Sequence, residues 1–140
     1  MVESLVCLSA KSDRSFARPK EKWRPPIDGR VKVNTDGAFV EGARHGSGAS
    51  VIRDHRGFVR AAQARWLGTV GDALMAEAIA TRDGLVLAQE MEYLHVILES
   101  DCSVLVAALK TTAIDRSSIA DLWHEIRELS GSFVVSFDVS

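Results

Sequence analysis

A short and almost uninterrupted run of apolar residues constrains the fold of this chain more than any other feature. The run extends from Leu94 to Leu98 and contains one polar residue, His95. A strand with apolar side chains on both sides is typical of the interior of a parallel or mixed sheet, where helices cover the faces. The sequence therefore predicts an α/β domain built around this strand.

The segments on either side complete this prediction. Val31 to Asp36 alternates apolar and polar residues, as strands with one buried face do. Residues 73–91 have the apolar spacing of a long helix, with Asp72 placed as its N-cap. Residues 37–48 contain four glycines and are predicted to form a loop. Further strands are predicted over 49–53, 58–66 and 133–139, and further helices over 103–110 and 118–129. The complete prediction is a five-stranded mixed sheet with helices on its faces, in which the elements follow the order βββαβααβ along the chain.

The size and charge of the chain fit one domain preceded by a short tail. Residues 1–22 are expected to form a disordered or extended tail, and residues 23–140 the domain. Seventeen basic residues against nineteen acidic ones give a formal charge of −2, which argues against tight nucleic-acid binding through phosphate neutralisation alone. The chain has no apolar run of the roughly 18 residues that a membrane span needs, and no basic signal-peptide start. We expect an intracellular monomer without a membrane partner.

Three acidic residues stand out by their positions. Asp36 ends the first predicted strand, and Asp101 follows the central strand. If a helical crossover makes these strands parallel neighbours, their ends lie about 5 Å apart at one edge of the sheet. Glu77 lies on the inward stripe of the long helix, where an unpaired carboxylate is costly.

These positions have two interpretations. Asp36 and Asp101 could be turn or capping residues, with Glu77 paired to an arginine. Alternatively, the three carboxylates form one cluster, which requires a compensating cation such as Mg²⁺, whose preferred ligands are oxygens at about 2.0–2.1 Å. The presence of all three at one sheet edge favours the second interpretation. Asp36, Glu77 and Asp101 are therefore the predicted metal ligands.

The same residues lie in segments that resemble the first three motifs of the ribonuclease H type 1 family. The segments are VKVNTDGA from Val31 to Ala38, AEA around Glu77, and LESDC from Leu98 to Cys102. The chain most resembles the plant ribonuclease-H-like domains that are associated with reverse transcriptases, to which WRPP from Trp23 and RDGL from Arg82 also fit. The resemblance extends from about Trp23 onward and implies a ribonuclease-H-like fold.

The resemblance also implies a reaction. In that family, four carboxylates hold two Mg²⁺ or Mn²⁺ ions for endonucleolytic hydrolysis of the RNA strand of an RNA–DNA hybrid. Carried over to this sequence, Asp36 would contact both ions, and Glu77 and Asp101 would each help to fix one, so that all three are catalytic. Glu77 would also lie near the RNA 2′-hydroxyl, the group that distinguishes RNA from DNA.

The fourth carboxylate of the family lies on a helix after the fifth strand, and the sequence ends at Ser140. We therefore expect a C-terminally truncated domain that lacks this helix and has reduced activity. Two functions stay open. One is an endonuclease acting on RNA–DNA hybrids, and the other is a catalytically degenerate, retroelement-derived module that binds nucleic acid or another partner.

Aromatic and basic residues outside these motifs are given structural roles. Trp66 and Trp123 are expected to be packing residues rather than platforms for base stacking, and His95 is expected to be structural on a buried strand. A basic cluster is interpreted as a solvated hairpin surface in preference to a phosphate contact. Its members are Arg53, His55, Arg56, Arg60 and Arg65.

Overall fold

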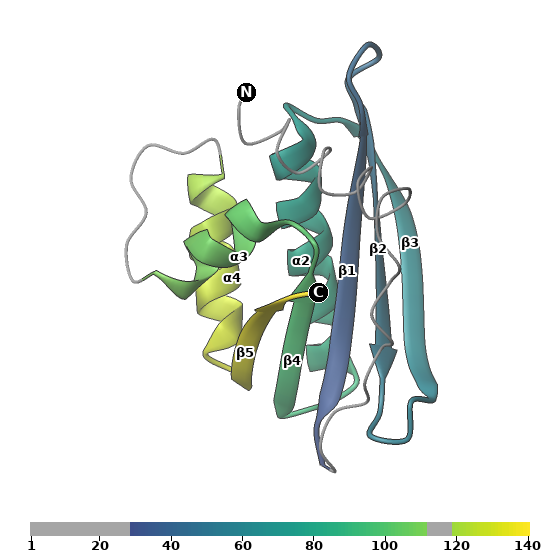
Figure 1. The fold of residues 1–140 in the computed structure, drawn as a ribbon, viewed down its shortest axis with the longest axis vertical. Helices are drawn as coiled ribbons and strands as arrows, with labels where there is room; N and C mark the ends of the chain where they lie inside the picture. Colours follow the sequence, from purple (N-terminus) through teal and green to yellow (C-terminus); the bar gives the residue numbers. More distant parts are fainter. Residues whose placement is uncertain (1–28, 112–118) are drawn as a thin grey trace.

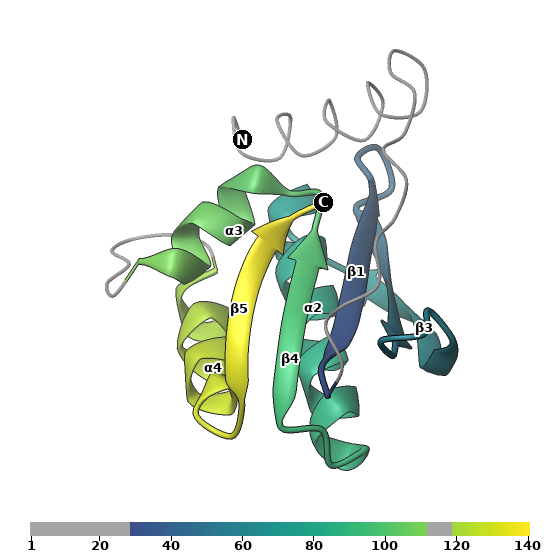
Figure 2. The same ribbon diagram turned by 60° about the horizontal axis from the view of Figure 1, so that its bottom comes forward.

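The computed structural model describes residues 29–111 and 119–140, so the predicted tail over residues 1–22 lies outside the described residues. The described residues form a five-stranded mixed sheet in the strand order β3-β2-β1-β4-β5, with the helices packed on one face (Figure 1, Figure 2). The order along the chain is βββαβααβ, which confirms the predicted fold. The elements are β1 (Val31–Val40), β2 (His45–Arg53), β3 (Val59–Thr69), α2 (Ala73–Glu90), β4 (His95–Ser100), α3 (Ser103–Lys110), α4 (Ala120–Ser130) and β5 (Val134–Val139).

The middle strand of the sheet is β1. It pairs antiparallel with β2 and parallel with β4, and β4 pairs parallel with β5. The predicted interior position of β4 is confirmed, but its two faces differ. Val96 and Leu98 are buried, whereas His95 is exposed, so the prediction that this strand is buried on both faces is wrong. The helices of the described residues account for this difference because they cover one face of the sheet (Figure 2).

The glycines over residues 37–48 mark a close contact between helix and sheet. Strand β1 continues through Gly37 and β2 begins at His45, so the predicted loop is wrong outside the short turn that joins the strands. A Cβ atom on Gly37 would lie 2.6 Å from the backbone nitrogen of Glu77, and one on Gly48 would lie 3.2 Å from the Cβ of Ala80. These glycines therefore make room for α2 against the strands.

Helix α2 has the start and the small-residue stripe that its sequence predicts. The side chain of Asp72 accepts a hydrogen bond of 2.8 Å from the amide of Met75, which caps the first turn. Farther along, a Cβ on Gly84 would lie 2.8 Å from the Cγ2 of Thr35 on β1. Small residues thus let α2 lie close enough to β1 for the two elements to share a site.

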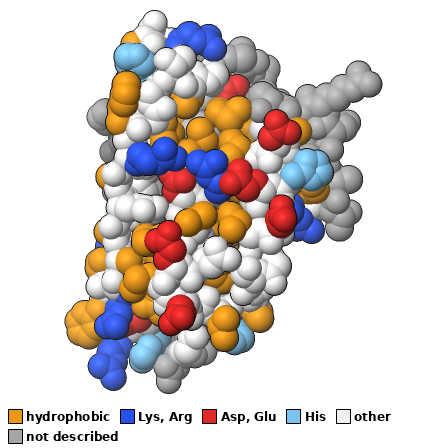
Figure 3. Space-filling view, turned by 180° about the vertical axis from the view of Figure 1, so that it is seen from behind, with side chains coloured by type: hydrophobic (Ala, Val, Ile, Leu, Met, Phe, Trp, Pro, Cys, Tyr) orange, Lys and Arg blue, Asp and Glu red, His pale blue; other side chains and the backbone are white. Residues whose placement is uncertain are grey.

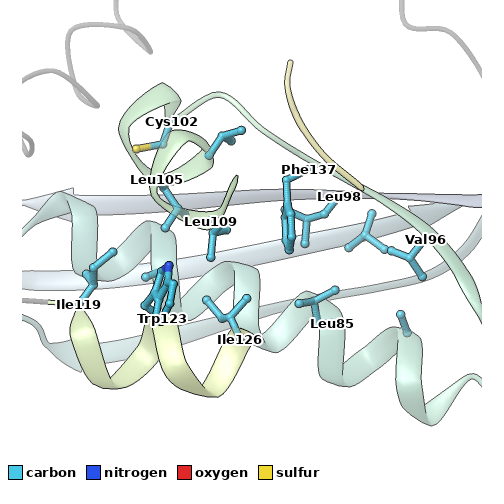
Figure 4. Packing of buried hydrophobic residues seen from close by; sticks show 14 of the residues in the cluster. Leu85, Val96, Leu98, Cys102, Leu105, Leu109, Ile119, Trp123, Ile126 and Phe137 are labelled. Carbon is cyan, nitrogen blue, oxygen red and sulfur yellow. The ribbon is translucent and has the colours of Figure 1, made fainter. Parts of the chain in front are cut away.

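The apolar core lies between the sheet and the helices (Figure 4). Trp123 is buried, as predicted, and its indole Nε1 donates a hydrogen bond of 2.8 Å to the carbonyl of Ala108. This bond joins α4 to α3, and α3 in turn packs against β4 and β5. The core members labelled in Figure 4 are Leu85, Val96, Leu98, Cys102, Leu105, Leu109, Ile119, Trp123, Ile126 and Phe137.

Charges of both signs are interspersed on the molecular face seen from behind, without a large basic region (Figure 3). Several are ion pairs, such as Arg65 with Asp83 at 2.9 Å and Arg82 with Glu125 at 3.4 Å. Arg65 is thereby drawn to Asp83 of α2, away from the other basic residues of the β2–β3 hairpin. Among the described helices, none has the length and apolar composition for crossing a membrane.

Candidate metal centre

Three carboxylates from distant parts of the sequence converge at one edge of the sheet. Asp36 belongs to β1, Glu77 to α2, and Asp101 directly follows β4. Each offers a ligand atom, and these atoms all lie within 4.8 Å of one another. The structure thus brings together the three residues that the sequence singles out, and Asp36, Glu77 and Asp101 form an acidic cluster.

The parallel register of two strands explains half of this convergence. Thr35 of β1 is the register partner of Ser100 of β4. The next residues along the chain are Asp36 and Asp101, so the parallel pairing places both carboxylates side by side where β4 ends. Strand β1 itself continues to Val40, so the prediction that it ends at Asp36 is wrong. In open α/β sheets, ligands bind outside the carboxyl ends of the strands.

Glu77 is held in place by its neighbours on both strands. Its side chain is fully buried, with 0% of its surface exposed. Oε1 accepts a hydrogen bond of 3.0 Å from the amide of Gly37, and Oε2 accepts one of 3.5 Å from the hydroxyl of Ser100. The Ser100 oxygen in turn accepts a bond of 3.1 Å from the amide of Cys102. These contacts orient the carboxylate toward the strand ends.

The cluster is buried on one side and open on the other. Asp101 is 8% exposed, whereas Asp36 is exposed. Two hollows meet at Asp36, one of about 320 Å³ that extends toward Trp66 and one of about 190 Å³ that Asp101 also lines. A molecule approaching from solvent would therefore meet Asp36 first, with Glu77 behind it.

The donor set fits a divalent cation. Three ionised carboxylates at this separation repel one another, and a divalent cation bound between them relieves the repulsion. Mg²⁺ takes oxygen ligands, and three carboxylates are donors of this kind. The ligand atoms of the cluster lie within 4.8 Å of one another, close enough for Asp36, Glu77 and Asp101 to hold a shared divalent cation.

Two supporting features of the site were missed in the sequence. The Gly37 amide and the Ser100 hydroxyl, which orient Glu77, carry no catalytic signature of their own, although both adjoin a predicted ligand.

Trp66 was predicted to be a packing residue, and this is wrong because 69% of its surface is exposed. Its position on the edge strand β3, on the face away from α2, explains the exposure.

Comparisons with solved structures identify the fold. The N-terminal RNase H domain of a Mycobacterium tuberculosis protein superposes with a TM-score of 0.72 at 15% identity, covering 79% of this chain and 86% of that one. RNase H1 from the archaeon Halobacterium salinarum gives 0.69 at 21% identity, covering 79% and 83%. LC11-RNase H1, solved in complex with an RNA/DNA hybrid, gives 0.71 at 15% identity, covering 79% and 84%. These likenesses confirm the ribonuclease-H-like fold.

Sequence comparison identifies the family. The curated protein sequences give no match to this chain. Residues 34–139 match the reverse transcriptase-like family, a span that begins just before Asp36 and includes all three carboxylates. The predicted resemblance to ribonuclease H is thereby confirmed, while its assignment to a plant subgroup stays a prediction. The chain belongs to the reverse transcriptase-like family and has the ribonuclease-H-like fold.

Proposed function

We propose that this chain is a metal-dependent nuclease that hydrolyses the RNA strand of RNA–DNA hybrids at the acidic cluster. The observation that supports this most is the approach of three carboxylate ligand atoms to within 4.8 Å of one another. They come from two adjacent strands, Asp36 from within β1 and Asp101 from just past the end of β4, and from a buried helix face, so the cluster is built by the fold rather than by a mobile surface. The reported hybrid complex of LC11-RNase H1, which has the same fold, supports the substrate class.

The three carboxylates have different tasks in this proposal. Glu77 is fixed by hydrogen bonds from Gly37 and Ser100, so it serves as the rigid ligand. Asp101 lies at the strand end beside it and is almost fully buried. Asp36 is exposed and borders both hollows, so it is the ligand that also faces the substrate phosphate.

Mg²⁺ or Mn²⁺ is the proposed cofactor because all three donors are carboxylate oxygens. When bound, such ions lower the pKa of a coordinated water and stabilise charge on the phosphate oxygens. The protein contributes the positions of the oxygens and a largely buried environment around Glu77 and Asp101, in which electrostatic interactions are stronger than in water.

Cleavage of a labelled RNA–DNA duplex tests the proposal. The chain is incubated with the hybrid in Mn²⁺, in Mg²⁺ and in EDTA, and the products are resolved by length. We expect slow cleavage within the RNA strand that requires the metal and is lost in Asp36→Asn. The matched control is Asp138→Asn, which removes an exposed carboxylate of β5 outside the cluster and should cleave like the wild type.

The alternative is a degenerate module that keeps the fold and binds nucleic acid without hydrolysis. An inert wild-type chain in both metals would overturn the nuclease proposal in favour of this module. Equal cleavage by the wild type and Asp36→Asn would also overturn it, because the activity would then not depend on the acidic cluster.

A further inference from the structure

The larger of the two hollows lies on the sheet face opposite α2. The antiparallel registers define its floor in two rows, one of Asp36, Ala49 and Ala64 and the next of Ala38, Ser47 and Trp66. The hollow has a volume of about 320 Å³, and its lining includes members of both rows. It is therefore continuous with the acidic cluster through Asp36.

An exposed tryptophan, Trp66, lines the far side of this hollow, and His45 lies against it. Trp66 is 69% exposed, and the ring of His45 lies edge-on to it, with centroids 5.5 Å apart and an angle of 79° between the planes. This edge-to-face contact stabilises one orientation of the indole. Gly68 has a positive φ of 72°, and the register is irregular between Gly46 and Ser47, so the strands are distorted beside the tryptophan.

The composition of the hollow favours a flat, uncharged group over a phosphate. Its floor carries the methyl groups of Ala38, Ala49 and Ala64 rather than large aliphatic side chains. Arg65 is the basic residue in the lining, and its guanidinium is already paired with Asp83 at 2.9 Å. A planar ring can therefore lie on the alanine floor and stack against the indole.

The distance from the cluster fits a nucleotide of a strand held there. From strand spacings of about 4.8 Å and a rise of about 3.4 Å per residue, the α-carbons of Asp36 and Trp66 are roughly 12 Å apart. Bases inside a duplex have both faces covered by their neighbours, whereas an unpaired base can stack on an aromatic side chain.

We infer that Trp66, supported by His45, is a stacking site for an unpaired nucleobase next to the segment held at the acidic cluster. This inference rests on the proposed function for its substrate. It gives the chain a preference for hybrids whose strand continues into a single-stranded extension over fully paired, blunt hybrids. The selectivity comes from the face of the base, so it tolerates any base sequence in the extension.

Binding in EDTA tests the inference without cleavage. Two fluorescently labelled hybrids with the same paired segment are compared by anisotropy, one blunt and one with a single-stranded RNA extension. We expect the extended hybrid to bind more tightly, and Trp66→Ala to weaken its binding roughly tenfold or more while leaving the blunt hybrid unchanged. Trp66→Phe, which keeps an aromatic face, should retain most of the preference.

Phe58→Ala is the matched control because Phe58 is also an exposed aromatic residue, at 61%, but lies by the β2–β3 turn outside the hollow. It should bind both hybrids like the wild type. If the wild type binds the blunt and the extended hybrid equally, and Trp66→Ala does the same, the stacking site is overturned. Asp36-dependent cleavage could persist in that case, and the proposed function would stand. A change in the sedimentation mass of Trp66→Ala without a change in hybrid binding would instead assign this surface to contact with a second copy and overturn the inference.

Discussion

The amide of Gly37 donates a hydrogen bond of 3.0 Å to Oε1 of Glu77. This bond joins β1, which carries Asp36, directly to the buried carboxylate of α2. A side chain at position 37 would collide with the helix backbone at 2.6 Å. One close contact therefore couples the packing of α2 on the sheet to the geometry of the acidic cluster.

Gly37→Ala should lower both stability and metal affinity. The added methyl group must displace α2 backbone, and overpacking of this kind costs about 1–3 kcal/mol of unfolding free energy. Urea unfolding measures the loss. Gly42→Ala is the control because a Cβ there meets nothing within 4 Å, and its effect should stay within about 0.5 kcal/mol. Equal urea midpoints for the two variants would show that the close approach does not constrain the helix.

Replacement of Glu77 should separate folding from metal binding. Glu77→Gln removes one of three neighbouring charges and keeps an acceptor for the Gly37 amide, so in EDTA it should unfold at a temperature no lower than the wild type. Mg²⁺ at about 100 times its dissociation constant would stabilise the wild type by about 2.7 kcal/mol. In thermal melts, Mg²⁺ should stabilise the variant clearly less than it stabilises the wild type.

Glu90→Gln, at the exposed end of the same helix, is the control for this comparison. It should respond to Mg²⁺ like the wild type. A Mg²⁺-dependent gain of equal size in Glu77→Gln would place the bound ion elsewhere.

The turn between β2 and β3 should make a small contribution to stability that depends on pH. Desolvation raises the pKa of Asp54, but hydrogen bonds from the amides of Arg56 and Phe58, with the charges of Arg60 and His55, outweigh it and hold the pKa below 3.8. A lowered carboxyl pKa stabilises the fold at a pH above the ordinary pKa of aspartate. This contribution is lost as the pH falls through the lowered pKa.

An NMR titration of the Asp54 carboxyl carbon measures this shift. We expect a midpoint below the value of 3.8 for an unperturbed aspartate. Asp54→Asn should accordingly lose stability relative to the wild type near neutral pH and show a smaller difference in strong acid. A midpoint at or above 3.8 would contradict the turn geometry.

Periodicity in the sequence predicts most of the fold because alternation and helical spacing are local signals. The first strand and the helix capped by Asp72 were both predicted, although the strand continues past Asp36 to Val40. The parallel crossover between β1 and β4 brings Asp36 beside Asp101. Inward placement of Glu77 followed from the small residues around it on the helix. These positions depend on short-range patterns and on the rule that two strands joined by a helical crossover tend to be parallel.

Features set by tertiary contacts could not be predicted in the same way. Gly37 and Gly48 resemble loop glycines in sequence, and only the approach of α2 shows that they belong to strands. The exposure of Trp66 and His95 depends on which sheet face the helices cover. A single sequence gives hydrophobicity but not this choice of face.

Titration of the wild type with Mn²⁺ by isothermal calorimetry tests the proposed metal centre most directly. Because Asp36, Glu77 and Asp101 present ligand atoms within 4.8 Å of one another, we expect weak but measurable binding that disappears in Asp36→Asn and in Asp101→Asn. Asp138→Asn, which removes an exposed carboxylate outside the cluster, should titrate like the wild type. Identical titration curves for the wild type and Asp36→Asn would contradict a metal centre at the acidic cluster.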